Sequence, residues 1–86
     1  DKLFSFSARN TPLRDMLVGL AKEAKLNLVI GRYVDGSAPV SLEFNNLPLK
    51  QALEEVLHTF QYSYKVDGNV LRVTAIAKRV FHFDYP

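Results

Sequence analysis

The sequence lacks cysteine, long hydrophobic runs and clusters of basic residues, and each absence removes a class of function. Without cysteine the chain has no disulfide framework, no thiolate nucleophile and no cysteine-ligated metal site. Its longest mostly apolar run, residues 16–21, is far shorter than the ~18 residues of a membrane-spanning helix. The basic residues are scattered, which disfavours a nucleic-acid-binding patch.

What remains is the composition of one small folded domain. The 86 residues are 48% hydrophobic and 23% charged, with 11 Lys and Arg against 9 Asp and Glu. Chains of this size and composition commonly form a single hydrophobic core. The sequence opens on Asp1 and enters a strand pattern at once, so we expect it to be part of a longer protein.

The sequence nearly repeats itself at an offset of 36 residues. Each copy reads as an alternating strand, a helix begun by proline and a second alternating strand. The repeat therefore predicts two β-α-β units related by an approximate two-fold. The matching pairs include Phe4 with Val40, Phe6 with Leu42, Pro12 with Pro48, Leu17 with Leu53 and Leu28 with Tyr64.

The periodicities predict a small α+β sandwich in which strand pairing stays open. We expect Thr11 to cap the first helix and Asn46 the second. The last strand follows an Asp67-Gly68-Asn69 hairpin turn. We expect the face of this strand that carries Leu71 and Val73 to point toward the core. The predicted helices span residues 12–24 and 48–60, and the predicted strands span residues 3–8, 26–30, 40–44, 62–66 and 70–75.

No catalytic, metal or cofactor site is predicted. The two histidines, His58 and His82, lie far apart and have no metal-ligand spacing. Glu54 and Glu55 are adjacent on a helix, where side chains point about 100° apart and cannot act as a dyad. The serines lack the G-x-S-x-G setting of a nucleophile. We therefore expect a protein that is not an enzyme.

The six Phe and four Tyr residues raise the alternative of base stacking on a sheet. Most of them occupy alternating or helical-stripe positions, where core packing explains them. A G-x-x-G loop of the kind that clamps RNA is also missing. We therefore expect no nucleic-acid partner.

A series of short motifs runs in a fixed order along residues 3–75. It comprises Leu13-x-x-x-Leu17-x-x-Leu20-Ala21, Leu26-Asn27-Leu28-Val29-Ile30, Val34-x-Gly36-x-x-Pro39-Val40, Leu47-Pro48-Leu49-x-x-Ala52-Leu53 and Gly68-Asn69-Val70-Leu71-Arg72-Val73. In this order and spacing the motifs resemble the short N-terminal domain shared by secretins and TonB-dependent receptors.

The resemblance implies an α+β fold of two helices packed against two small β-sheets, with no catalysis and no cofactor. It implies a domain over residues 1–76 and a connector, 77–86, that leads to a following domain. In secretins this domain is a periplasmic part of an outer-membrane ring of Gram-negative bacteria and does not itself insert into the membrane. In TonB-dependent receptors it signals to an anti-sigma regulator. The tail Arg79-Val80-Phe81-His82-Phe83-Asp84-Tyr85 resembles the connector of pilus-type secretins and favours the secretin.

The implied partners are inner-membrane components of a type IV pilus or type II secretion machine and neighbouring secretin subunits in a ring. A physical mode for such docking is strand addition at an exposed edge. Our candidate edge is the first strand, where a purely structural role is the alternative. Its residues are Lys2, Leu3, Phe4, Ser5, Phe6 and Ser7.

Replacing Ser5 with Pro, or placing like charges at Ser5 and Ser7, should weaken docking to an inner-membrane partner, because both changes oppose strand addition. The measurement is a titration of the partner with a folded variant. Unchanged affinity would remove this edge from consideration.

Overall fold

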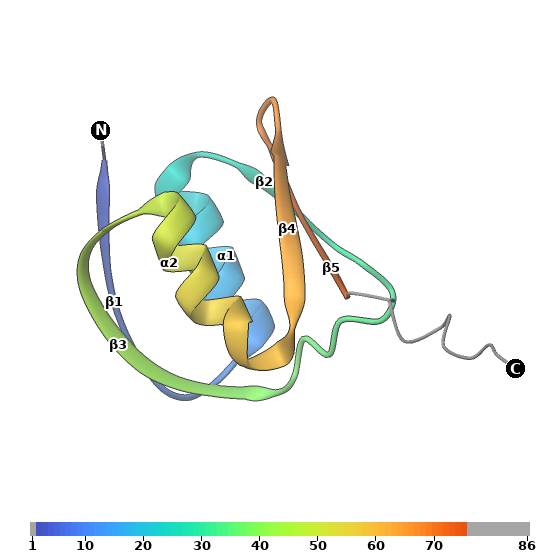
Figure 1. Cartoon of the computed structure of the whole chain (residues 1–86), viewed down its shortest axis with the longest axis horizontal. Coiled ribbons are helices and arrows are strands. Elements are labelled where there is room, and N and C mark those ends of the chain that lie inside the picture. Colours follow the sequence, from blue (N-terminus) through green and yellow to red (C-terminus); the bar gives the residue numbers. More distant parts are fainter. Residues whose placement is uncertain (1, 76–86) are drawn as a thin grey trace, which may run out of the picture.

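The structure, a computed structural model, describes residues 2–75 and confirms the predicted α+β fold (Figure 1). The proposed connector, with His82, lies outside the described residues. The elements are β1 (Leu3–Pro12), α1 (Leu13–Ala24), β2 (Asn27–Ile30), β3 (Pro39–Pro48), α2 (Leu49–Leu57) with a 3₁₀ turn (His58–Phe60), β4 (Tyr62–Asp67) and β5 (Val70–Ala75).

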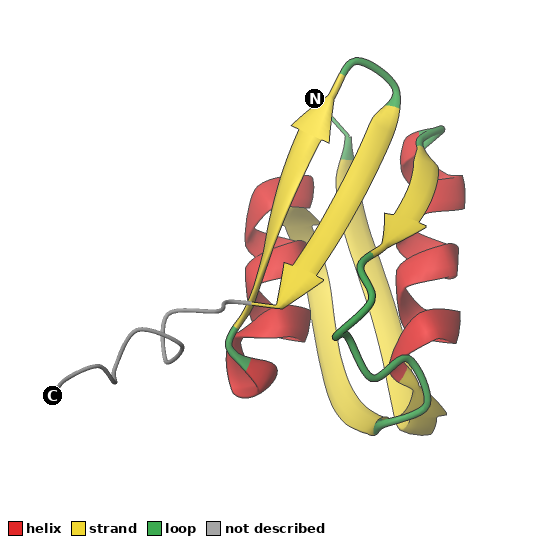
Figure 2. Ribbon diagram, turned by 90° about the vertical axis from the view of Figure 1, so that its right-hand side faces the viewer, coloured by secondary structure: helices red, strands yellow, loops and turns green. Residues whose placement is uncertain are grey.

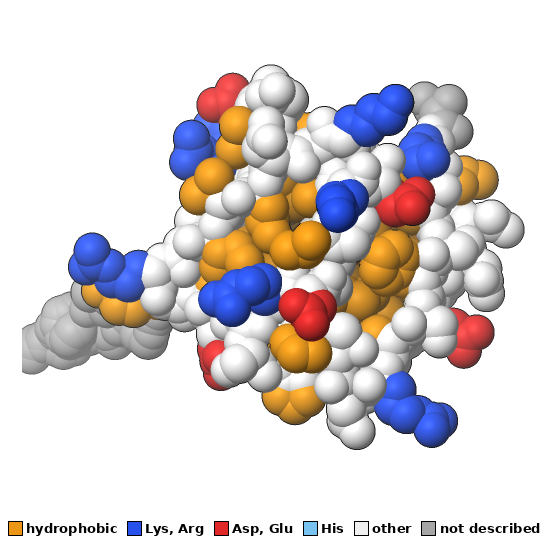
Figure 3. Space-filling model, turned by 180° about the vertical axis from the view of Figure 1, so that it is seen from behind, with side chains coloured by type: hydrophobic (Ala, Val, Ile, Leu, Met, Phe, Trp, Pro, Cys, Tyr) orange, Lys and Arg blue, Asp and Glu red, His pale blue; other side chains and the backbone are white. Residues whose placement is uncertain are grey.

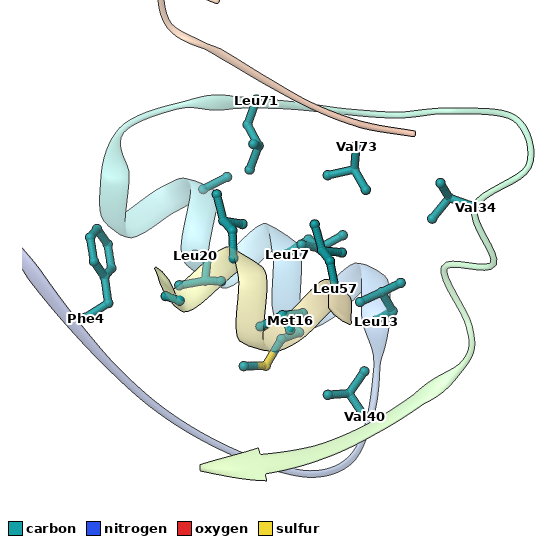
Figure 4. Close-up of a cluster of buried hydrophobic side chains, with 14 of the residues drawn as sticks. Phe4, Leu13, Met16, Leu17, Leu20, Val34, Val40, Leu57, Leu71 and Val73 are labelled. Carbon is teal, nitrogen blue, oxygen red and sulfur yellow. The ribbon is translucent and has the colours of Figure 1, made fainter. Parts of the chain in front are cut away.

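The two helices lie between two separate sheets (Figures 1 and 4). β1 and β3 pair antiparallel in a two-stranded sheet, whereas the second sheet has the order β2-β5-β4. Within it, β5 runs parallel to β2 and antiparallel to β4 (Figure 2). β2 and β4 are equivalent in the repeat, so the extra strand β5 sits between the two matching strands.

The core is built by one apolar stripe from each helix and by inward residues of both sheets. Leu71 and Val73 are fully buried, so the favoured inner face of β5 is confirmed. Burying a side chain of this size contributes about 1.5–3 kcal/mol. The buried helical residues are Leu13, Met16, Leu17, Leu20 and Ala21 on α1 and Ala52, Leu53, Val56 and Leu57 on α2.

The antiparallel pairing of β1 with β3 shows the predicted approximate two-fold symmetry between the two copies of the repeat. Leu3 of β1 pairs with Pro48 of β3, and Pro12 of β1 pairs with Pro39 of β3. In the repeat, Leu3 corresponds to Pro39 and Pro12 to Pro48, so the two strand pairs are equivalent. Ser7 pairs with Glu43, which is the same position in the other copy, so the two-fold passes through this pair. The repeat is therefore a symmetric strand pairing inside one chain.

Backbone conformation follows the same repeat. Among residues 2–75, four non-glycine residues have positive φ, and they form two pairs 36 residues apart: Asn10 with Asn46, and Lys25 with Gln61. The first pair lies near the irregularities of β1 and β3, and the second ends the helical segments. Asparagine tolerates the left-handed region better than most residues, which suits Asn10 and Asn46 to these irregular positions of the two strands.

The predicted helix caps were wrong. Pro12 and Pro48 occupy the N-cap positions, and no side-chain capping bond forms at either helix. The N–H groups of Leu13 and Arg14 instead donate to the carbonyl oxygens of Ala38 and Gly36, both at 2.8 Å. Because β1 continues through Thr11, that residue belongs to the strand, and the loop before β3 satisfies the start of α1.

Phe6 packs its ring directly on the backbone of α1. A Cβ atom at Gly19 would lie 2.7 Å from Cζ of Phe6, closer than real side-chain contacts allow. The same ring stacks against Phe44, with centroids 6.2 Å apart. Glycine at position 19 thus lets the two-stranded sheet approach α1 closely.

Gly19→Ala should destabilise the fold by about 1 kcal/mol, because overpacking costs about 1–3 kcal/mol and the helix-propensity gain is about 1 kcal/mol. Urea unfolding measures the change. In a Phe6→Leu background the clash disappears, so the same substitution should become neutral or stabilising. Equal destabilisation in both backgrounds would contradict the contact.

Candidate docking surface

Residues 2–75 offer exposed surfaces for binding and no internal polar centre. None of their polar or charged side chains is buried, and no group of three or more His, Asp or Glu among them could hold a metal ion. His58, Glu54 and Glu55 are all exposed. None of the helices in this part of the chain is long and apolar enough to cross a membrane.

The six candidate docking residues, Lys2 to Ser7, lie together at the start of β1, but they do not share one environment. Phe4 is buried against the helices with only 4% of its surface exposed, and Phe6 is half-buried on Gly19. Leu3, in contrast, is 52% exposed despite its apolar side chain. The strand therefore combines core residues with an exposed apolar one.

One edge of β1 is open among the described residues. β1 pairs with β3 on one side, and their sheet contains no further described strand. An unpaired edge presents N–H and C=O groups that can pair with an added strand. This geometry is compatible with the predicted docking mode.

Ser5 has a structural role that the sequence reasoning missed. The backbone N–H of Asn46 donates to Oγ of Ser5 at 3.0 Å, and the N–H of Asn10 donates to Oγ of Ser41 at 2.9 Å. The two bonds are related by the repeat, and they hold the backbone of Asn10 and Asn46, which have positive φ within β1 and β3. The signal was present in the sequence as two Ser-Asn pairs at the same offset.

A hollow of about 350 Å³ adjoins the start of β1. Lys2 lies at its rim, where Nζ is 3.8 Å from Glu23 and 5.9 Å from the ring centroid of Phe4. Both charged side chains of this pair are more than half exposed, so the pair adds little stability. The hollow is lined by Lys2, Phe4, Ala24, Pro48 and Leu49.

A second hollow, of about 360 Å³, lies between α2 and β4 and was not predicted. Burial, and then the negative charge of Glu54, raises the pKa of Tyr64 above its ordinary value. The neighbouring Tyr62 hydroxyl accepts a hydrogen bond from the N–H of Asp35 at 3.0 Å. The lining residues are Glu54, Leu57, His58, Tyr62, Ser63 and Tyr64.

Basic side chains do not merge into one patch on the face that Figure 3 shows. They stand apart from one another, and acidic and apolar side chains lie between them. A nucleic-acid backbone is bound by clustered Lys and Arg. This face lacks that arrangement.

Comparisons with known proteins find a curated bacterial relative. It is 38% identical over 68 residues to the DNA utilization protein HofQ of Escherichia coli K12, a match that covers 79% of this chain and 16% of HofQ. The chain thus spans about a sixth of the length of this curated relative. No protein-family profile matches the sequence.

Solved structures show the same fold. The N0 domain of the type II secretin from enterotoxigenic Escherichia coli matches with a TM-score of 0.66 and 16% identity, over 88% of this chain and 98% of that domain. A candidate anti-sigma factor from Parabacteroides distasonis matches with a TM-score of 0.74 and 14% identity, over 85% of this chain and 34% of that one. With the HofQ match, these findings confirm the resemblance predicted from the sequence.

Glu54→Gln should lower the pKa of Tyr64, because it removes a negative charge that opposes ionisation of the phenol. A pH titration of the Tyr64 ring by NMR measures it, with the adjacent Glu55→Gln as the matched control that leaves the pKa unchanged.

The same shift ties stability to pH. The folded state holds the Tyr64 proton more tightly than the unfolded chain does. The contribution of Tyr64 to the free energy of unfolding is therefore complete below the unfolded pKa of about 10, and it is lost as the pH rises through the folded pKa. If Glu54→Gln and Glu55→Gln give the same Tyr64 titration curve, Glu54 does not act on the phenol.

Proposed function

We propose that this secretin N0-like domain is a non-catalytic docking module in the periplasmic part of an outer-membrane channel of a Gram-negative bacterium. The observation that carries the proposal is the 38% identity to HofQ over most of the chain. The structural match to nearly the whole N0 domain of a type II secretin supports it.

The proposed partners are the inner-membrane components of a type IV pilus or type II secretion machine. The name of HofQ associates that relative with DNA utilization, so a machine that handles DNA is a third setting for the same docking role. Neighbouring secretin subunits in a ring are the second class of partner. In each setting the domain itself binds protein.

The proposed docking site is the outer edge of β1, from Lys2 to Ser7. Its open edge can accept main-chain hydrogen bonds from an added strand. The exposed Leu3 gives that strand an apolar contact, and the hollow beside Lys2 can accept a side chain. Phe4 and Phe6 hold the edge in place from the core.

A second candidate function is the signalling domain of a TonB-dependent receptor that binds an anti-sigma regulator. The match of the fold to a candidate anti-sigma factor supports this alternative. Its identity of 14% speaks for the fold alone, whereas the 38% identity to HofQ favours the secretin. Sequencing the gene past the codon for residue 86 would separate the two, since a receptor would continue into a plug and a large membrane barrel.

Leu3→Asp should weaken binding to the inner-membrane partner at least tenfold, equal to about 1.4 kcal/mol, because it places a charge where an apolar contact forms. Calorimetric titration with the periplasmic domains of the machine's inner-membrane proteins from the same bacterium measures the affinity. Leu3 is a better position for this test than Ser5, because the Ser5 hydroxyl accepts a hydrogen bond from the N–H of Asn46 and its replacement would also disturb the fold.

The matched control is Val29→Asp, which introduces the same charge at an apolar residue of the other sheet that is 41% exposed. Val29→Asp should leave the affinity within about twofold, and thermal unfolding should show both variants folded. Equal affinities for the two variants would exclude the β1 edge and leave the docking function to another surface.

A further inference from the structure

We propose a second docking site, at the groove between α2 and β4, that binds an extended segment of a partner protein and takes a lysine or arginine side chain beside Glu54. This site is separate from the β1 edge and does not depend on it. The occupant is identified by its chemistry, a strand with a cationic side chain. Three observations support this site: the unpaired edge of β4, the negative charge of Glu54, and the difference between the two copies of the repeat at these positions.

The groove runs along the outer edge of β4. It touches three consecutive residues, Tyr62, Ser63 and Tyr64, whose side chains alternate between the two faces of the sheet. The two tyrosines are half-buried on the helix side, whereas Ser63 is exposed with its hydroxyl 3.3 Å from that of Thr74. The hollow lies beside the strand, and β5 occupies the other side of β4.

That edge is unpaired among the described residues. β4 is the last described strand of its sheet, and its six residues from Tyr62 to Asp67 pair only with β5. A segment in extended conformation can therefore form main-chain hydrogen bonds there.

The charge of the groove selects a cation. Glu54 lines it, and no Lys or Arg does. Within residues 2–75 the detected ion pair joins Lys2 and Glu23, so Glu54 is left without a described cationic partner. The effect of Glu54 on the pKa of Tyr64 agrees with a carboxylate that faces into the groove.

Lysine and arginine fit both kinds of group in this groove. Their charge pairs with a carboxylate, and it is attracted to the faces of aromatic rings. Tyr62 and Tyr64 line the groove together with Glu54 and supply the rings. An acidic side chain in the same place would be repelled by Glu54.

The repeat shows that the fold does not require these polar groups. The positions that correspond to Glu54, Tyr62 and Tyr64 in the first copy are Val18, Leu26 and Leu28. Those apolar residues fill the same places in the same helix-strand unit. The carboxylate and both phenols are thus specific to the second copy, as expected for residues that serve binding.

The experiment is an NMR titration of the whole 86-residue chain with a blocked seven-residue peptide of alternating valine and lysine. Saturable amide shifts should appear in β4 and the second half of α2. Glu54→Gln should weaken binding about tenfold, as loss of a charge-assisted contact does. Glu55→Gln, which removes the same charge from the neighbouring exposed residue outside the groove, should leave the affinity unchanged.

Two further probes separate charge from strand pairing. A peptide of alternating valine and glutamate should not bind. A valine-lysine peptide with alternate backbone nitrogens methylated should lose binding, because it cannot complete the main-chain ladder. Leu3→Asp should leave peptide binding intact, so failure of the β1 site and failure of this one are distinguishable.

Four outcomes would overturn the proposal. The first is no saturable binding at millimolar peptide, and the second is an equal loss in Glu54→Gln and Glu55→Gln. The third is concentration-dependent shifts of α2 and β4 without peptide, which would make a second copy the occupant. The fourth is tighter peptide binding after Lys78→Gln with Arg79→Gln, which would make the chain's own last segment the occupant.

Discussion

The structure depends on the need of each helix to bury apolar surface against two sheets at once. Leu13, Met16 and Leu17 on α1 are fully or almost fully buried, as are Leu53 and Val56 on α2. A helix of 9–12 residues is marginal on its own, and tertiary packing supplies most of its stability. The helices therefore fix the distance between the sheets, and in residues 2–75 the two candidate docking sites lie at outer strand edges.

The sequence predicted the elements well because its apolar spacing repeats. The two 36-residue copies give matching strands and helices, and in the structure β1 and β3 pair symmetrically about Ser7 and Glu43. Capping was mispredicted at Thr11 because the choice between a side-chain and a main-chain acceptor depends on the distant loop carbonyls of Gly36 and Ala38. The pairing of the strands could not be predicted, because no local sequence pattern indicates that β5 lies between β2 and β4.

Candidate sites were predicted less completely than the fold. The alternation at the start of β1 indicated a strand, but only the structure separates the buried Phe4 from the exposed Leu3. The groove beside Glu54 and Tyr64 was invisible for another reason. Its residues come from the second half of a helix, the 3₁₀ turn after it and a strand, each of which looks ordinary alone, and packing brings them together. The repeat offered one clue, because Glu54 replaces Val18.

The strand β5 has a consequence for how the domain can be oriented. Two equivalent halves would offer a partner two indistinguishable ways of approach, related by the internal two-fold. β5 has no counterpart in the first copy, and it runs parallel to one neighbour and antiparallel to the other. It therefore makes the domain asymmetric, so that a binding partner can distinguish the two ends of the three-stranded sheet.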